Sequence, residues 1–165
     1  MVSNRGMRRI SFLLLVLATA SCRRNIEVEK ALAITDVHTG WYDAGIQADG
    51  KNKLVPSLSM RLKNVSSETV SSVQLVAIFR RVNEPEVAWG EHFVRAIGPD
   101  GLAPGASTSP IVLRSNLGYT GTQPRLQLLQ NREFVDAKVD IFGRHGSRNL
   151  VKTGEYKIDR QLLTQ

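Results

Sequence analysis

The clearest structural signal in this 165-residue chain is the run LSMRLKNVSSETVSSVQLVAIFRRV, residues 58–82. Its first part alternates the apolar residues Leu58, Met60 and Leu62 with polar neighbours, which is the period-2 pattern of a half-buried strand. A turn sequence at residues 64–69 follows. The second part is apolar on one face and partly apolar on the other, which predicts a central strand.

Shorter segments on both sides of this run have the same strand character. Glycine-rich and proline-rich stretches separate them, and no strand alternates with a long amphipathic helix. The predicted strands lie near residues 31–42, 54–65, 70–82, 87–96, 111–113, 135–141 and 151–158, with a helical turn near residues 124–132. This order predicts an all-β fold, an antiparallel immunoglobulin-like β-sandwich of about seven strands.

Pro56 adds a prediction about position within the sheet. Proline has no N–H to donate to a neighbouring strand, so it favours an edge position or confines the pairing to residues after 56. If a partner adds a strand to an edge of the sheet, residues 54–63 are the candidate edge strand, because Pro56 marks them as peripheral. On this hypothesis Met60→Pro abolishes partner capture, and unchanged capture with an intact fold would exclude this edge.

The run at residues 58–82, together with GLAPGAS at residues 101–107, resembles the immunoglobulin-like domains of bacterial lipoproteins, including the FxLyD type. The shared features are a strand ending in an Asn turn, a Val/Phe strand and a Pro-Gly turn. After Phe79 the chain continues Arg80-Arg81-Val82-Asn83, without the Leu and Asp of the type pattern. The resemblance implies a β-sandwich outside the cytoplasm and assigns no catalytic residue.

The first 21 residues have the layout of a secretory signal peptide. Residues 1–9 are basic, residues 10–20 are mostly apolar, and small residues follow. The apolar part is shorter than the roughly 20 residues that a permanent membrane-spanning helix needs. We therefore expect export and cleavage of residues 1–21.

Cys22 is the only cysteine and follows Ala20-Ser21 directly. This arrangement resembles the lipobox of bacterial lipoproteins, although Thr19 stands where an aliphatic residue is usual. The resemblance implies lipidation of Cys22, a membrane anchor through that lipid, and a location in the outer membrane facing the periplasm. The alternative is an ordinary signal peptide that leaves a soluble periplasmic or secreted protein. Residues 22–30 are expected to form a lipid-attached tether, and residues 31–165 a single domain.

The net charge of +7 does not indicate a nucleic-acid-binding protein. Three of the basic residues lie among residues 1–21, and without them the charge falls from +7 to +4. The remaining basic residues are scattered among acids, whereas nucleic-acid binding favours a basic stripe with interleaved aromatic residues. Nucleic acid is therefore not an expected partner.

No assembled catalytic or metal motif is present in the sequence. His38, His92 and His145 lie far apart, without the spacing of a zinc site. Asp43 and Asp49 lack the spacing of a twelve-residue calcium loop, and the common serine-enzyme motifs are absent. We predict no cofactor and no enzymatic activity.

These observations favour a non-catalytic envelope lipoprotein whose domain binds another envelope protein. The alternative is a module that binds a glycan or a small apolar ligand in the periplasm. Trp41, Tyr42 and Tyr119 are the candidate aromatic residues for that role, although aromatic residues are often core anchors. With Met60 on the expected edge strand, these four residues form the predicted ligand or partner surface.

Overall fold

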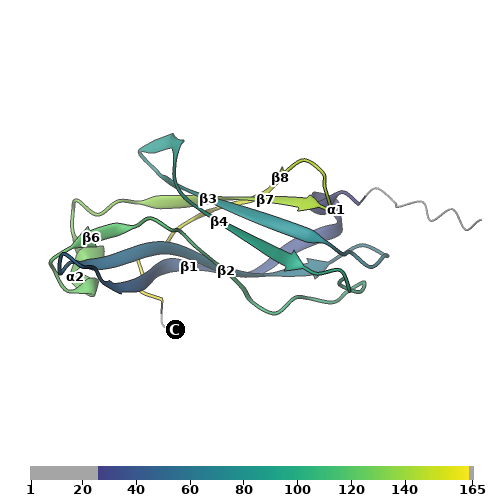
Figure 1. Ribbon diagram of the computed structural model, residues 1–165, viewed down its shortest axis with the longest axis horizontal. Coiled ribbons are helices and arrows are strands. Elements are labelled where there is room, and N and C mark those ends of the chain that lie inside the picture. Colours follow the sequence, from purple (N-terminus) through teal and green to yellow (C-terminus); the bar gives the residue numbers. More distant parts are fainter. Residues whose placement is uncertain (1–25, 164–165) are drawn as a thin grey trace, which may run out of the picture.

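The structure, a computed structural model, describes residues 26–163. These residues form eight strands in two antiparallel sheets that pack as a β-sandwich, with two short helices beside them (Figure 1). The elements are α1 (Val28–Ala31), β1 (Leu32–Ile46), β2 (Asn52–Asn64), β3 (Val73–Arg81), β4 (Glu84–Ile97), β5 (Ile111–Arg114), β6 (Tyr119–Gly121), α2 (Arg125–Gln130), β7 (Ala137–His145) and β8 (Val151–Lys157). The predicted all-β sandwich with a short helix is confirmed, with eight strands where the sequence predicts about seven.

The first sheet has the order β1-β2-β5, and β6 pairs with the start of β2. β2 is therefore central, and the prediction of an edge strand around Pro56 is wrong. Pro56 lies between the part of β2 that pairs with β6 and the part that pairs with β5. Its carbonyl accepts a hydrogen bond from the Ser115 amide. In an antiparallel strand the backbone nitrogen and carbonyl of one residue point to the same side. The Pro56 nitrogen, which has no hydrogen to donate, therefore points to the position where β6 ends and β5 begins as the partner of β2.

The second sheet has the order β4-β3-β7-β8. β3 pairs with β4 on one side and with β7 on the other, so its predicted central position is confirmed. Its inward residues are Val73, Leu75, Ala77 and Phe79, and all four are buried. The alternation seen in the sequence therefore separates the core face of β3 from its outer face.

The core fills the space between the inner faces of the two sheets. Fully buried apolar side chains from both sheets form one continuous cluster. The largest of them are Trp41, Leu54, Leu58, Met60, Leu62, Val70, Leu75, Phe79, Leu113, Leu128, Ile141 and Ile158. Burial of this apolar area is the main favourable contribution to folding.

The chain joins the sandwich through Ile26 and α1. Val28 is 5% exposed and Ala31 is 6% exposed, and Ile26 packs against the core. The expectation that residues 22–30 form a tether is therefore wrong for residues 26–30, because apolar residues among the charged ones dock on the domain. Residues 1–25, including the predicted signal peptide and Cys22, lie outside the described residues.

The free edge of β1 is partly covered by the C-terminal segment. The Trp41 amide donates to the Gln161 carbonyl, and the Trp41 carbonyl accepts from the Leu163 amide. Thr39 donates a side-chain hydrogen bond to Asp159 at 3.0 Å. These contacts satisfy backbone groups that an exposed edge strand would offer to another chain.

The two ends of the sandwich differ, and the chain enters at only one of them. α1 lies at one end, and α2 lies at the other (Figure 1). We call the second the distal end, and define it by α2, the turn between β3 and β4, and residues 131–136. The 13 residues of β2 run between the two ends and span roughly 40 Å.

Candidate functional site

Two of the four residues predicted to form a surface are buried. Trp41 and Met60 are both 0% exposed and belong to the core cluster. Met60 pairs with Ile111 in the middle of a sheet, so Met60→Pro would disrupt β2 and cannot report on an edge. The prediction that Trp41 and Met60 face a ligand or partner is therefore wrong.

Tyr42 and Tyr119 lie in different places. Tyr42 is on the outer face of the first sheet, where the Arg114 guanidinium lies 3.6 Å from its ring centroid. Tyr119 is in β6 and packs inward, with its ring centroid 4.8 Å from that of Phe134. The structure therefore does not bring the four predicted residues together on one surface.

An aromatic cluster instead supports the distal end from inside. The Trp41 ring centroid lies 4.5 Å from that of Phe134 and 6.1 Å from that of Trp89. Tilted and edge-on ring pairs at these distances add stability beyond their buried area. Trp41 and Tyr119 thus meet through Phe134, which no pattern in the sequence singles out, and they meet as core residues.

A groove of about 400 Å³ lies at the distal end, next to this cluster. It is lined by Val82, Asn83, Arg132, Glu133, Phe134, Val135, Asp136 and Arg160. The Arg160 guanidinium is 2.8 Å from Asp136 and donates to the Phe134 carbonyl at 3.0 Å. The hydrogen bond from Arg160 lowers the pKa of Asp136, so this carboxylate stays charged beside the groove.

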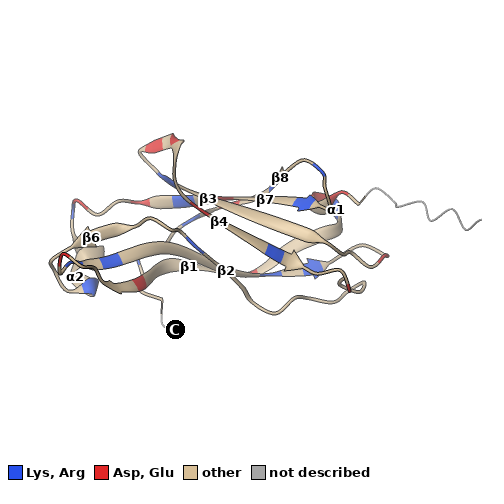
Figure 2. Cartoon of the chain, viewed as in Figure 1, with Lys and Arg blue, Asp and Glu red and all other residues tan. Residues whose placement is uncertain are grey.

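The turn between β3 and β4 projects from the sandwich (Figure 1). Its residues Val82 and Asn83 line the distal groove. Val82 is 47% exposed and Val87 is 60% exposed, and the acidic Glu84 and Glu86 lie between them. Figure 2 shows this acidic tip standing apart from the body of the sandwich. Exposed apolar side chains next to charges are a common composition for a protein interface.

The outer face of the second sheet carries a second exposed apolar group. In the strand register Val76 lies between Phe93 and Phe142, so the three side chains form a row across β4, β3 and β7. Phe93 is 56% exposed. Val76 and Phe142 are half-buried. We call these three residues the apolar row.

Charged side chains next to the apolar row form a compact network. Asp140 is 5% exposed, and it lies 3.0 Å from Arg80 and 2.8 Å from Lys152. Burial raises the pKa of Asp140, but hydrogen bonds from Lys152 and Arg80 outweigh that effect and hold the pKa below its usual value. Glu155 also binds Lys152, so this ammonium contacts two carboxylates.

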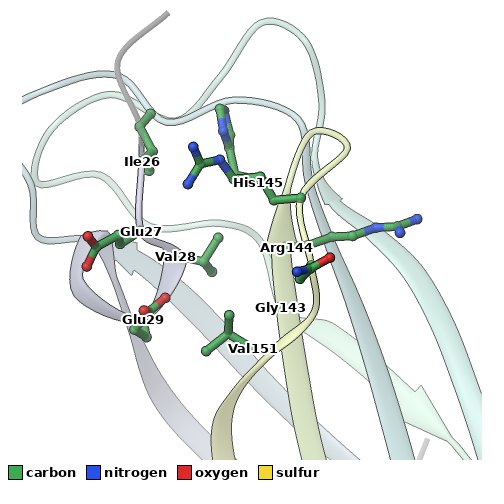
Figure 3. A pocket seen from close by; sticks show the side chains of 10 residues that line it. Ile26, Glu27, Val28, Glu29, Gly143, Arg144, His145 and Val151 are labelled. Atoms are coloured by element: carbon green, nitrogen blue, oxygen red, sulfur yellow. The ribbon is translucent and has the colours of Figure 1, made fainter.

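A pocket of about 380 Å³ lies at the opposite end, where α1 meets the β7–β8 hairpin. Figure 3 shows Val28 and Val151 facing each other at its base, with Glu27 and Glu29 on one side. The Arg144 side chain extends away from the pocket and donates to Gln74 at 2.7 Å. Glu27 forms an ion pair with Lys30, so its charge is already compensated.

The three histidines occupy separate strands. His38 is in β1, His145 is in β7, and His92 in β4 has its Nδ1 2.9 Å from the Arg114 carbonyl. Within residues 26–163, no three histidine, cysteine or acidic side chains are grouped as a metal site would require. No helix in the same range is long and apolar enough to cross a bilayer.

Phe93 faces solvent, although the sequence pattern predicts that it faces the same side of the strand as Trp89. Trp89 and Phe93 have even spacing, which predicts the same face of a strand. The pairing of β3 with β4 shifts by one residue between Phe79 and Arg80, opposite Gly90 and Ala88. This bulge lets Trp89 pack against the core, whereas Phe93 faces outward. Glycine at position 90, next to Trp89, is the sequence signal that could have indicated the bulge.

Comparisons with known proteins add little. No protein-family model and no curated protein matches the chain. Among solved structures, the chain is similar to the X-ray structure of Northeast Structural Genomics Consortium target SoR45. The sequence identity is 10%, the TM-score is 0.42, and the match covers 80% of this chain and 89% of that chain. A likeness at this level supports no statement about function.

Proposed function

We propose that this protein is a non-catalytic lipoprotein of the cell envelope, attached to the membrane through a lipid on Cys22. Its β-sandwich binds another envelope protein through the distal end. The observation that carries the proposal is the projecting turn beside the distal groove, with Val82 and Val87 exposed around an acidic tip.

The placement of the two ends supports this surface. A chain anchored near its N-terminus holds the α1 end close to the membrane. The distal end then lies roughly 40 Å further out, beyond the lipid headgroups. A protein partner in the periplasm reaches this end without displacing the anchor.

The chemistry of the turn indicates the kind of partner. Val82 and Val87 fit an apolar patch, and Glu86 fits a basic side chain beside it. Glu84 pairs with Arg81 at 3.3 Å and can share its second oxygen with the same basic rim. We therefore expect an envelope protein that presents an apolar site with a basic rim. The alternative of a glycan or small apolar ligand is not proposed, because Trp41 is buried and Arg114 lies over the Tyr42 ring.

The first test concerns the membrane anchor. We expect the mature protein, recovered from the membrane fraction of its host, to begin at Cys22 and to carry a mass addition of diacylglycerol size. A mature chain that is cleaved without added lipid would refute the anchor.

The second test concerns the distal surface. A photo-cross-linking amino acid is placed at Val82 or Val87 in living cells, and at Val65 as a matched control. Val65 is 55% exposed and lies beside Ala31 at the α1 end. We expect one discrete adduct from positions 82 and 87, absent from position 65. The same adduct from all three positions, or none from 82 and 87, would contradict the proposed surface.

A further inference from the structure

The outer face of the second sheet has a regular arrangement of charge about its apolar row. Two residues further along the strands on one side are Arg95, Gln74 and Arg144. Two residues further on the other side are Glu91, Ile78 and Asp140. The apolar row thus lies midway between two rows of different charge. One row has arginine on β4 and on β7, and the other has a carboxylate on β4 and on β7.

The residues at the β4 end of these rows are open to a partner. Glu91, Phe93 and Arg95 are all exposed. Neither the Glu91 carboxylate nor the Arg95 guanidinium forms an ion pair within residues 26–163. Phe93 places a large apolar side chain between these two charges, each about 7 Å away along the strand.

We propose that this face binds a second copy of the same chain, with a two-fold axis that lies in the interface and runs across the strands through the apolar row. The rotation brings Phe93 onto the partner's Phe93 and Val76 onto the partner's Val76. It also places Arg95 opposite the partner's Glu91. The face is therefore complementary to itself, as an isologous interface requires.

Charge selects this axis over the other two-fold arrangement of the same two faces. An axis parallel to the strands would place the basic row on the partner's basic row and the acidic row on the partner's acidic row. Facing like charges disfavours that arrangement. The axis across the strands reverses the order of the rows, so each Arg95 faces the partner's Glu91. At the β7 end the charge of Asp140 is already compensated by Arg80 and Lys152, so the contact between Arg95 and Glu91 carries the selection.

Lys152 pairs with Phe142 at the end of the apolar row, so among residues 26–163 it is the cation that this axis brings near the same residue of the partner copy. Its ammonium lies 2.8 Å from Asp140 and 2.5 Å from Glu155. The two carboxylates compensate the charge of each Lys152. Repulsion between the copies at this position is therefore weakened.

The proposed interface can be tested with a single cysteine substitution. Phe93→Cys places a thiol next to its own copy, and Val112→Cys is the control because Val112 is 43% exposed on the other sheet. The full chain is produced in its host, and whole cells are treated with a short bismaleimide cross-linker, so the test does not require the membrane anchor. The parent chain shows any cross-linking that occurs through Cys22. We expect at least tenfold more cross-linked dimer from Phe93→Cys than from Val112→Cys or the parent chain.

Charge reversal tests the orientation of the two copies. In the Phe93→Cys chain, Glu91→Arg or Arg95→Glu alone should reduce cross-linking at least tenfold, because like charges then face each other. Co-production of the two single variants should restore it. In the mixed dimer, positions 91 and 95 are both basic in one chain and both acidic in the other, so both contacts are again of opposite sign. Restoration in trans is not expected if these substitutions merely damage the fold.

Three results would overturn the proposal. The first is equal cross-linking of Phe93→Cys and Val112→Cys. The second is cross-linking that the charge reversals leave unchanged. The third is an adduct of Phe93→Cys to a different protein. None of these readouts depends on Val82, on Val87 or on the lipid anchor, so the dimer and the proposed function can fail separately.

Discussion

Gly118 shows how one residue adapts a loop to the sheet beside it. A Cβ atom at this position would lie 2.2 Å from the Leu54 carbonyl oxygen and 2.8 Å from a Val55 methyl group. The carbonyl belongs to the backbone of a central strand and cannot easily move. Gly98 is different, because no atom lies within 4 Å of a Cβ built there and its backbone is not left-handed.

Substitution of these two glycines by alanine should therefore have different effects on stability. Gly118→Ala should lower the free energy of unfolding by about 2 kcal/mol, because the added methyl overpacks a fixed backbone. Gly98→Ala should change it by less than about 0.5 kcal/mol. Urea denaturation of both variants checks this. Equal stability of the two variants would show that the loop at residues 115–118 adjusts freely.

At the element scale, the C-terminal segment stabilises β1 by pairing with its edge. Removal of residues 159–165 would leave the Trp41 amide and carbonyl without their partners at Gln161 and Leu163. Each lost hydrogen bond costs about 1 kcal/mol, and the uncovered edge can pair with other chains.

We therefore expect a chain that ends at Ile158 to melt at least several degrees below a control chain that ends at Leu163. It should also aggregate sooner on warming. Circular dichroism measures the melting temperature, and light scattering measures aggregation. The edge would need another protecting element if the two chains melt and scatter alike.

At the scale of the whole molecule, ion pairs tie separate parts of the fold together. The hydrogen bond from Arg125 lowers the pKa of Asp43, and the bond from Arg160 lowers the pKa of Asp136. At Asp140, burial raises the pKa, but Lys152 and Arg80 lower it further than burial raises it. A carboxyl group with a lowered pKa in the folded state stabilises the fold above its ordinary value of 3.8.

Stability should therefore be constant from neutral pH to about pH 5 and should fall below about pH 4, as these carboxylates are protonated. Asp140→Asn should cost about 2 kcal/mol at pH 7 and flatten the acid part of the curve. Asp100→Asn is the control, because Asp100 is exposed in a turn and forms no ion pair within the described residues. Urea denaturation at a series of pH values measures the effect, and parallel curves for both variants would contradict it.

The local patterns of this chain were enough to predict its class and every strand except the short β6, which lies in a segment predicted as a loop. Alternation of apolar and polar residues marks which face of β2 and of β3 is buried, because successive side chains of a strand point to opposite sides. Pro124 and the leucines after it predict a helical turn, and α2 is found there. A single sequence carries this information because each pattern depends only on neighbouring residues.

Two features could be determined only from the tertiary structure. They are the order of the strands within each sheet and the choice of side chains that remain exposed. A central strand accommodates Pro56 because the partner strand changes at that point. A bulge at Trp89 turns that ring inward, whereas Phe93 faces outward beside Val76. Trp41 is buried because Phe134, 93 residues further along the chain, packs against its ring. These outcomes depend on which distant segments become neighbours, which no local periodicity records.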